Sequence, residues 1–145
     1  MKKIYLILLL TITTQLYAKQ VGDFSLPIYG QDKEFNLKKE AQNYNKIVVN
    51  FWASWCTACI KELKELEHLK ASNVDKKVLF VAINAGEKKK KIKKFLRKYK
   101  FSYLILEDKN RIVSKSLGIE ELPRTLVINK DLSTSYNSNI PPKDI

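Results

Sequence analysis

The sequence predicts an α/β fold in which a central mixed sheet is flanked by helices. Two stretches, residues 47–52 and 78–83, are almost continuously apolar, as strands covered on both faces are. Amphipathic segments with the period of a helix lie between and after them. With 145 residues, of which 45% are hydrophobic, the chain has room for one domain with a substantial core.

The first residues predict an exported protein. Lys2 and Lys3 precede a mostly apolar stretch at residues 4–14, and the small residue Ala18 follows a polar break. This order is typical of a secretory signal peptide. The apolar stretch is shorter than the ~20 residues of a spanning helix, which favours cleavage after Ala18. Because Leu16 stands where such sites usually carry a small residue, an uncleaved anchor remains the alternative.

This interpretation assigns residues 1–18 to the signal and residues 19–145 to a single folded domain. The domain is expected in the periplasm or on the outer face of the cytoplasmic membrane. That compartment is oxidising, so a pair of cysteines there can be either redox-active or structural.

The domain begins with an expected hairpin. Residues 22–27 and 34–37 are strand-like and are separated by turn-forming residues. Pro27 cannot donate to a sheet ladder, which makes the hairpin an edge element. The two apolar stretches then follow as central parallel strands. Between them, residues 59–70 place apolar side chains on one face, as in a crossover helix.

Residues 88–100 predict a second helix, which is strongly basic. They contain eight lysines, one arginine and no acid, while Ile92, Phe95, Leu96 and Tyr99 fall on one helical face. The simplest interpretation is a solvated lysine face. The alternative is a weak contact with an anionic membrane surface or with an acidic partner, in a chain of net charge +12. No nucleic-acid partner is expected, because no recognition helix or aromatic stacking platform is present.

The remaining elements complete the expected sheet. A strand is predicted at residues 103–106, a short helical segment at 112–117 and a last apolar strand at 126–128. The polar tail at residues 132–145 is expected to add one edge strand around residues 135–136. Strands that alternate with helices in this way define the α/β class.

The two cysteines carry the chemistry. Cys56 and Cys59 follow an apolar strand and open a helix, so both sulfurs lie on one face and can form a disulfide. A loop this short gains little stability from a disulfide, which favours a chemical role. Free N–H groups and the helix dipole would stabilise a Cys56 thiolate as the nucleophile. Cys59, further along the helix, would stay a thiol until it resolves a mixed disulfide.

A CxxC pair is also half a zinc site or a structural staple. Zinc requires four ligands, and the chain has no second CxxC; its only histidine, His68, is expected to face solvent. The only methionine is Met1, which disfavours a copper carrier. We therefore expect redox exchange without a metal or cofactor. A copper or zinc carrier and a non-catalytic docking module remain the alternatives.

Glu62 lies three residues beyond Cys59, near the base of the same helical face. A carboxyl group held beside a thiol in apolar surroundings would have a raised pKa and could move a proton to or from Cys59. An ordinary exposed helix glutamate fits the spacing equally well.

Residues 50–59 resemble the strand and active-site turn of the thioredoxin-like reductases of the bacterial envelope, the TlpA, ResA and CcmG group. Asn50 of this chain stands where cytosolic thioredoxins have a buried aspartate. Glu62 matches the acid of the family's CxxCxxE motif. Residues 81–106 are similar to the central helix and strand insertion of the group. Residues 118–129 resemble the loop that carries the family's cis-proline.

The resemblance implies a thioredoxin fold and a set of site residues. Cys56, Cys59 and Glu62 would be catalytic. Pro123 would be the cis-proline, and it would expose the backbone of Leu122 to an extended substrate strand beside Cys56. Trp55 completes the expected substrate-binding residues.

The resemblance also implies partners. The expected activity is reduction of protein disulfides by a monomer, with electrons from a membrane donor of the CcdA or DsbD kind. Apocytochrome c is the expected substrate if the protein acts in cytochrome c maturation. Arg124 departs from the family pattern and adds positive charge at the substrate groove. Residues 140–145 resemble the entry to the family's last helix. We therefore expect either that the protein lacks this helix or that the sequence is truncated, and apolar sheet surface would be left uncovered.

Overall fold

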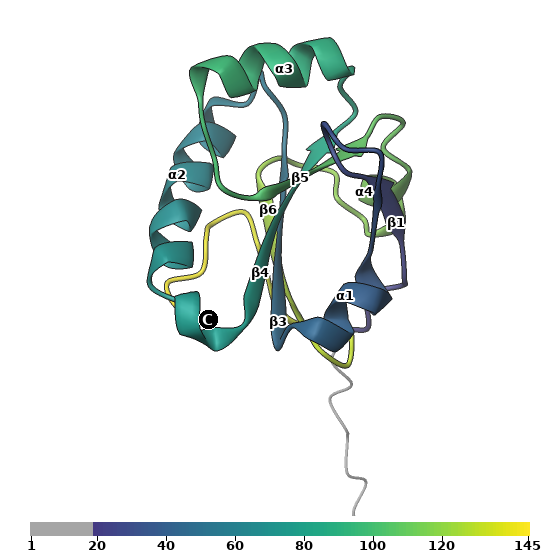
Figure 1. The fold of residues 1–145 in the computed structure, drawn as a ribbon, viewed down its shortest axis with the longest axis vertical. Helices are drawn as coiled ribbons and strands as arrows, with labels where there is room; N and C mark the ends of the chain where they lie inside the picture. Colours follow the sequence, from purple (N-terminus) through teal and green to yellow (C-terminus); the bar gives the residue numbers. More distant parts are fainter. Residues whose placement is uncertain (1–18) are drawn as a thin grey trace, which may run out of the picture.

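The computed structural model describes residues 19–145, so the expected signal lies outside the described residues. Within that range the chain is an α/β sandwich built around a five-stranded sheet (Figure 1). The strands are β1 (Ser25–Pro27), β2 (Glu34–Asn36), β3 (Lys46–Trp52), β4 (Val78–Ala85), β5 (Leu104–Asp108), β6 (Arg124–Asn129) and β7 (Thr134–Ser138). The helices are α1 (Leu37–Asn43), α2 (Thr57–Ala71), α3 (Lys89–Lys98), α4 (Ile112–Ser116) and a 3-10 turn, Val74–Lys76. In this part of the chain, no helix has the length and apolar character needed to cross a membrane.

The sheet is mixed, as predicted. Its strand order is β5-β4-β3-β6-β7, with β3, β4 and β5 parallel and with β6 and β7 antiparallel to their neighbours. The predicted hairpin forms between β1 and β2 and is joined to the edge of the sheet by a bridge between Ile28 and Leu106. These features confirm the expected thioredoxin-like architecture, in which β3 lies centrally and leads toward the two cysteines.

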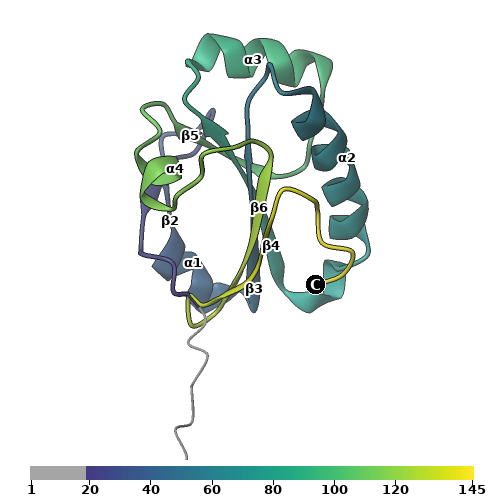
Figure 2. The ribbon, with the colours of Figure 1, turned by 180° about the vertical axis from the view of Figure 1, so that it is seen from behind.

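Alternation along the central strand divides the core in two. Ile47, Val49 and Phe51 face the side covered by the hairpin, α1 and α4, whereas Val48 and Trp52 face the side covered by α2 and α3. Figures 1 and 2 show these two layers on opposite sides of the sheet. Because both faces are covered, strands β3 and β4 are apolar along almost their whole length.

Helix α1 was not predicted, and the strand expected at residues 34–37 ends at Asn36. The Asn36 side chain accepts a hydrogen bond of 2.8 Å from the backbone N–H of Lys39 and so caps a helix. Leu37 and Ala41, one turn apart, are the buried residues of this helix. The segment is too short for a helical period to show in the sequence.

Other predicted elements are present with shifted ends. The helix expected at residues 59–70 begins at Thr57, because Cys56 is its N-cap. The basic helix is shorter than expected and ends at Lys98, and the strand expected at 103–106 begins one residue later and extends to Asp108. The last apolar strand, expected at 126–128, begins at Arg124.

After the edge strand β7, the described chain forms no further helix. Instead, residues 139–145 turn back toward α2, as the yellow segment in Figure 2 shows. Pro142 is buried, and Tyr136 and Ile145 pack against the core on the α2 side of the sheet. The apolar surface that we expected to be uncovered is therefore partly covered by this short segment.

Candidate active site

Cys56 and Cys59 are joined by a disulfide, with their Cα atoms 5.2 Å apart. Strand β3 ends at Trp52, and the following turn brings Cys56 to the N-cap position of α2. There the Cys56 Sγ accepts a hydrogen bond of 3.1 Å from the backbone N–H of Cys59. The first turn of α2 contains no acidic residue. The amide groups and the helix dipole therefore act on the Cys56 sulfur, as the sequence predicted.

The two cysteines differ in access to solvent. Cys56 is 6% exposed and Cys59 is completely buried. An incoming sulfur can therefore reach Cys56 first, while Cys59 stays inside the core. Trp55, directly before Cys56, is 72% exposed and offers an apolar surface beside the disulfide.

Glu62 is only 3% exposed, which rules out an ordinary exposed glutamate. It lies one turn beyond Cys59 on α2, among the buried residues of that helix. Burial raises the pKa of Glu62 to about 7, although a hydrogen bond from Thr125 and the charge of Arg124 act in the opposite direction. A carboxyl group of this kind can hold or release a proton near neutral pH.

A buried polar chain fixes one oxygen of Glu62. The Asn50 Nδ2 donates a hydrogen bond of 2.9 Å to the hydroxyl group of Thr125, which in turn donates to Glu62 Oε1. Asn50 on β3 and Thr125 on β6 are register partners, so the sheet itself aligns them. Within residues 19–145, Glu62 Oε2 has no hydrogen-bond partner and can carry the proton. Sequence reasoning missed Thr125, because its partners are distant in the chain.

The peptide bond between Leu122 and Pro123 is cis, as expected. Strand β6 begins directly afterwards, and its first residue, Arg124, pairs with Phe51 near the end of β3. The proline loop and the cysteine turn therefore lie at the same end of the sheet. Leu122 packs against the core cluster that contains both cysteines. The structure thus brings the predicted catalytic residues and this loop to one region.

Glu87 contacts the cysteine turn, and the sequence analysis assigned it no role. Its carboxylate accepts hydrogen bonds of 2.6 Å from the backbone N–H and from the hydroxyl group of Ser54, and one of 2.8 Å from Asn84 Nδ2. Ser54 lies in the turn that carries Cys56. Glu87 therefore ties the cysteine turn to the end of β4. The contact spans 33 residues, so no local pattern reveals it.

The residues that could bind a metal ion lie apart in the described part of the chain. His68 is exposed near the C-terminal end of α2, whereas the cysteines lie at its N-terminal end. In residues 19–145, no three histidine, cysteine or acidic side chains gather as a possible metal-binding group.

Comparison with known proteins identifies relatives of this chain. A profile of the Redoxin family matches residues 18–143. The thiol-disulfide oxidoreductase ResA of Halalkalibacterium halodurans is 32% identical over 84 residues, which are 58% of this chain and 48% of that protein. ResA of Bacillus subtilis is 30% identical over 89 residues, or 59% of this chain and 48% of that protein. The chain spans about half the length of the curated relatives it matches.

Solved structures show the same fold. A thiol-disulfide oxidoreductase from Bacteroides fragilis superposes with a TM-score of 0.75 at 20% identity, covering 86% of this chain and 93% of the other. StoA from Bacillus subtilis gives 0.69 at 19% identity, covering 84% and 90%. The similarity of the chain to the ResA proteins and the shared fold agree with the resemblance expected from the sequence. The family profile over residues 18–143 shows that the chain belongs to the Redoxin family.

Proposed function

We propose that this protein is an exported thiol:disulfide oxidoreductase that reduces disulfides of envelope proteins. The observation that carries the proposal is the placement of Cys56. Its sulfur caps helix α2, and the buried Cys59 and Glu62 follow along the same helix. The names of the ResA relatives support the same class of activity.

The chemistry starts from the reduced protein. The Cys56 thiolate attacks one sulfur of a substrate disulfide, forms a mixed disulfide and releases one substrate thiolate. Glu62 then accepts the Cys59 proton, which it later passes to the substrate sulfur that Cys59 displaces. Cys59 attacks Cys56 Sγ, which releases the second substrate sulfur and leaves the Cys56–Cys59 disulfide. Two electrons have then moved to the substrate, and a donor must restore the dithiol.

The cis-proline loop is the proposed substrate platform. Pro123 directly precedes β6 beside the cysteine turn, so the backbone of Leu122 is available to pair with an extended substrate segment. The exposed Trp55 adds apolar contact area beside Cys56. This arrangement favours a polypeptide disulfide over a small free one.

Export and the partners belong to the same proposal. The signal-like sequence at residues 1–18 supports a location outside the cytoplasm. An exported reductase needs electrons from the cytoplasmic side, which a membrane donor of the CcdA or DsbD kind can supply. Apocytochrome c, whose haem-binding cysteines must be reduced, is the proposed substrate.

A trapping experiment tests this function. In the full chain, Cys59→Ala leaves the nucleophile but removes the resolving thiol, so substrates should accumulate as mixed disulfides with Cys56. Identification of trapped apocytochromes supports the narrow assignment, and a broad set of envelope proteins supports a general reductant. The double variant Cys56→Ser with Cys59→Ala is the matched control. Equal capture by that control contradicts the proposal.

The direction of electron flow is tested separately. Equilibration of the purified protein with glutathione buffers gives its reduction potential. A value near that of thioredoxin, about −270 mV, is the expected result for a reductase. A value near about −120 mV indicates an oxidant and overturns this part of the proposal.

A further inference from the structure

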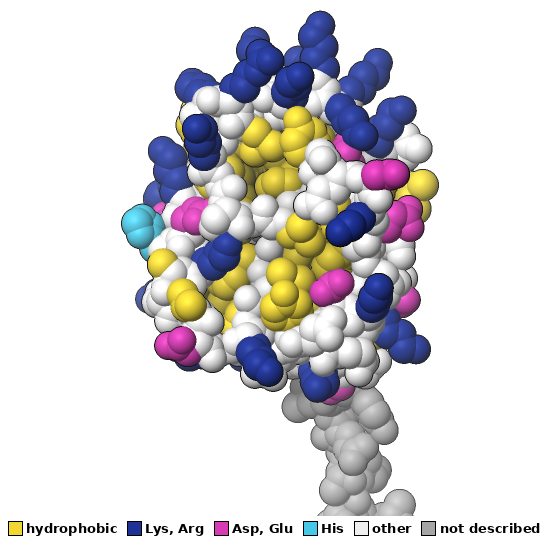
Figure 3. Space-filling view, viewed as in Figure 1, with side chains coloured by type: hydrophobic (Ala, Val, Ile, Leu, Met, Phe, Trp, Pro, Cys, Tyr) yellow, Lys and Arg dark blue, Asp and Glu magenta, His cyan; other side chains and the backbone are white. Residues whose placement is uncertain are grey.

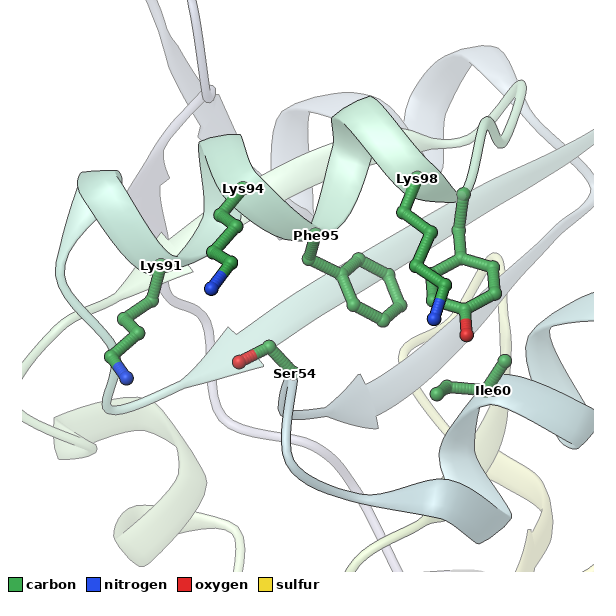
Figure 4. Close-up of a pocket in the computed structure, with 7 residues that line it drawn as sticks. Ser54, Ile60, Lys91, Lys94, Phe95 and Lys98 are labelled. Carbon is green, nitrogen blue, oxygen red and sulfur yellow. The ribbon is translucent and has the colours of Figure 1, made fainter.

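A groove lies between the basic helix α3 and the start of α2. Its volume is about 420 Å³, which is within the range of about 300–1,000 Å³ typical of ligand clefts. The residues that line it are Ser54, Ile60, Lys91, Lys94, Phe95, Lys98 and Tyr99. Figure 4 shows the three lysines extending from α3 toward Ser54 and Ile60.

The groove adjoins the disulfide in the chain. Ser54 comes two residues before Cys56, and Ile60 directly follows Cys59. Glu87 fixes Ser54 through two hydrogen bonds of 2.6 Å, and the N–H of Ile60 donates to the carbonyl oxygen of Cys56. The wall of the groove on this side is therefore continuous with the cysteine turn.

The floor of the groove is apolar and well packed. Phe95 is buried, and its ring centroid lies 4.5 Å from that of Trp52 and 4.9 Å from that of Tyr99. Trp52 is completely buried at the end of β3. The floor therefore rests on the same strand that leads to the cysteines.

The side of the groove formed by α3 is cationic. Helix α3 contains six lysines, one arginine and no acidic residue. In Figure 3, basic side chains lie along the top of the molecule, and hydrophobic side chains gather below them. Within residues 19–145, Lys91, Lys94 and Lys98 make no salt bridge; the only one from this helix joins Lys89 to Glu107. Three positive charges over an apolar floor fit a segment that combines acidic and apolar side chains.

We propose that the groove between α2 and α3 binds an acidic, apolar segment of the protein substrate and so selects which disulfides reach Cys56. This inference rests on the proposed function and adds a substrate class to it. A protein segment suits the site better than a membrane surface, because an open groove beside the cysteine turn gives position as well as charge. A flat lipid surface would contact the outward-facing lysines equally.

Matched peptides test the preference. Two peptides carry the same internal disulfide, and the segment before it alternates glutamate and leucine in one and glutamine and leucine in the other. The full chain is reduced beforehand, and the second-order rate constant of a single turnover is measured with each peptide. The acidic peptide should react about tenfold faster at low ionic strength. The advantage should vanish near 1 M salt, where the screening length is only about 3 Å.

Two triple variants locate the effect. Lys91→Gln, Lys94→Gln and Lys98→Gln together should remove the preference for the acidic peptide. The control changes Lys90→Gln, Lys93→Gln and Arg97→Gln, which removes the same charge from the same helix but from exposed positions outside this groove. The control should retain most of the preference. Circular dichroism and thermal unfolding verify that both variants fold.

Several results overturn the inference. Equal rates for the two peptides, or equal loss in both triple variants, exclude a specific groove. A third result would assign the face to a membrane instead. In that case the triple variant of Lys91, Lys94 and Lys98 loses binding to phosphatidylglycerol vesicles but keeps the preference for the acidic peptide. The uncharged peptide separates this inference from the proposed function. If the wild type reduces the uncharged peptide as fast as the acidic one, only the inference about the groove fails. If the wild type reduces neither peptide, the inference and the proposed function both fail.

Discussion

The two cysteines occupy positions one helical turn apart, yet they meet different surroundings. Cys56 Sγ receives the N–H of Cys59 at the start of α2, whereas Cys59 is enclosed in the core. In the reduced protein, iodoacetamide should therefore modify Cys56 at pH 7 faster than it modifies free cysteine, and Cys59 should react slowly. Mass spectrometry of the reduced chain at timed intervals measures both rates. Equal modification of the two residues contradicts the assignment of Cys56 as the nucleophile.

Glu62 should make the stability of the protein depend on pH. Burial raises the pKa of Glu62 from 4.5 to about 7, so between these values the folded protein holds a proton that the unfolded chain has released. The contribution of Glu62 to the free energy of unfolding is therefore fully present below pH 4.5 and is lost as the pH rises through 7. The expected loss is about 3 kcal/mol, because each unit of pKa difference corresponds to about 1.4 kcal/mol.

Replacement of Glu62 by glutamine isolates this effect. Urea unfolding at pH 5 and pH 8 should show that Glu62→Gln removes most of the loss between the two values. The same variant should slow the step in which Cys59 resolves a mixed disulfide, because its proton acceptor is gone. Glu120→Gln changes an exposed glutamate and is the control. A pH dependence that Glu62→Gln leaves unchanged contradicts the role of this carboxyl group.

At the scale of the elements, Glu87 joins the cysteine turn to the end of β4. Glu87→Ala removes three accepted hydrogen bonds, two of them from Ser54, whereas Ser54→Ala removes only the one from the hydroxyl group. Glu87→Ala should therefore destabilise the protein by about 1–3 kcal/mol and slow insulin reduction. Ser54→Ala should have a smaller effect on both. Equal effects of the two variants in urea unfolding and activity assays contradict a role for the backbone contact.

The same elements show what a sequence can reveal. Strands β3 and β4 were predictable because burial on both faces makes them continuously apolar, and the two cysteines because strand and helix flank them. Helix α1 was missed because its seven residues bury only Leu37 and Ala41. The contacts of Thr125 with Glu62 and of Glu87 with Ser54 span 63 and 33 residues, so they exist only once the sheet has formed.

At the scale of the whole molecule, the segment after β7 covers part of the core. On the α2 side, the sheet is covered by two helices and by residues 139–145, which return across it. Pro142 is buried, Ile145 packs against this core, and the Tyr136 hydroxyl group donates a hydrogen bond of 2.6 Å to the carbonyl oxygen of Ile140. The segment thus protects apolar surface that would otherwise meet water.

Deletion of residues 139–145 should therefore lower the free energy of unfolding by about 1–3 kcal/mol, since the apolar contacts of Pro142 and Ile145 are lost. The cysteine turn lies at the far end of β3, so insulin reduction at low temperature should change little. Urea unfolding of the deletion variant measures the loss, with Lys143→Ala, an exposed residue of the same segment, as the control. An unchanged unfolding midpoint would mean that the segment does not protect the core. A loss of activity without a loss of stability would instead place the segment in substrate binding.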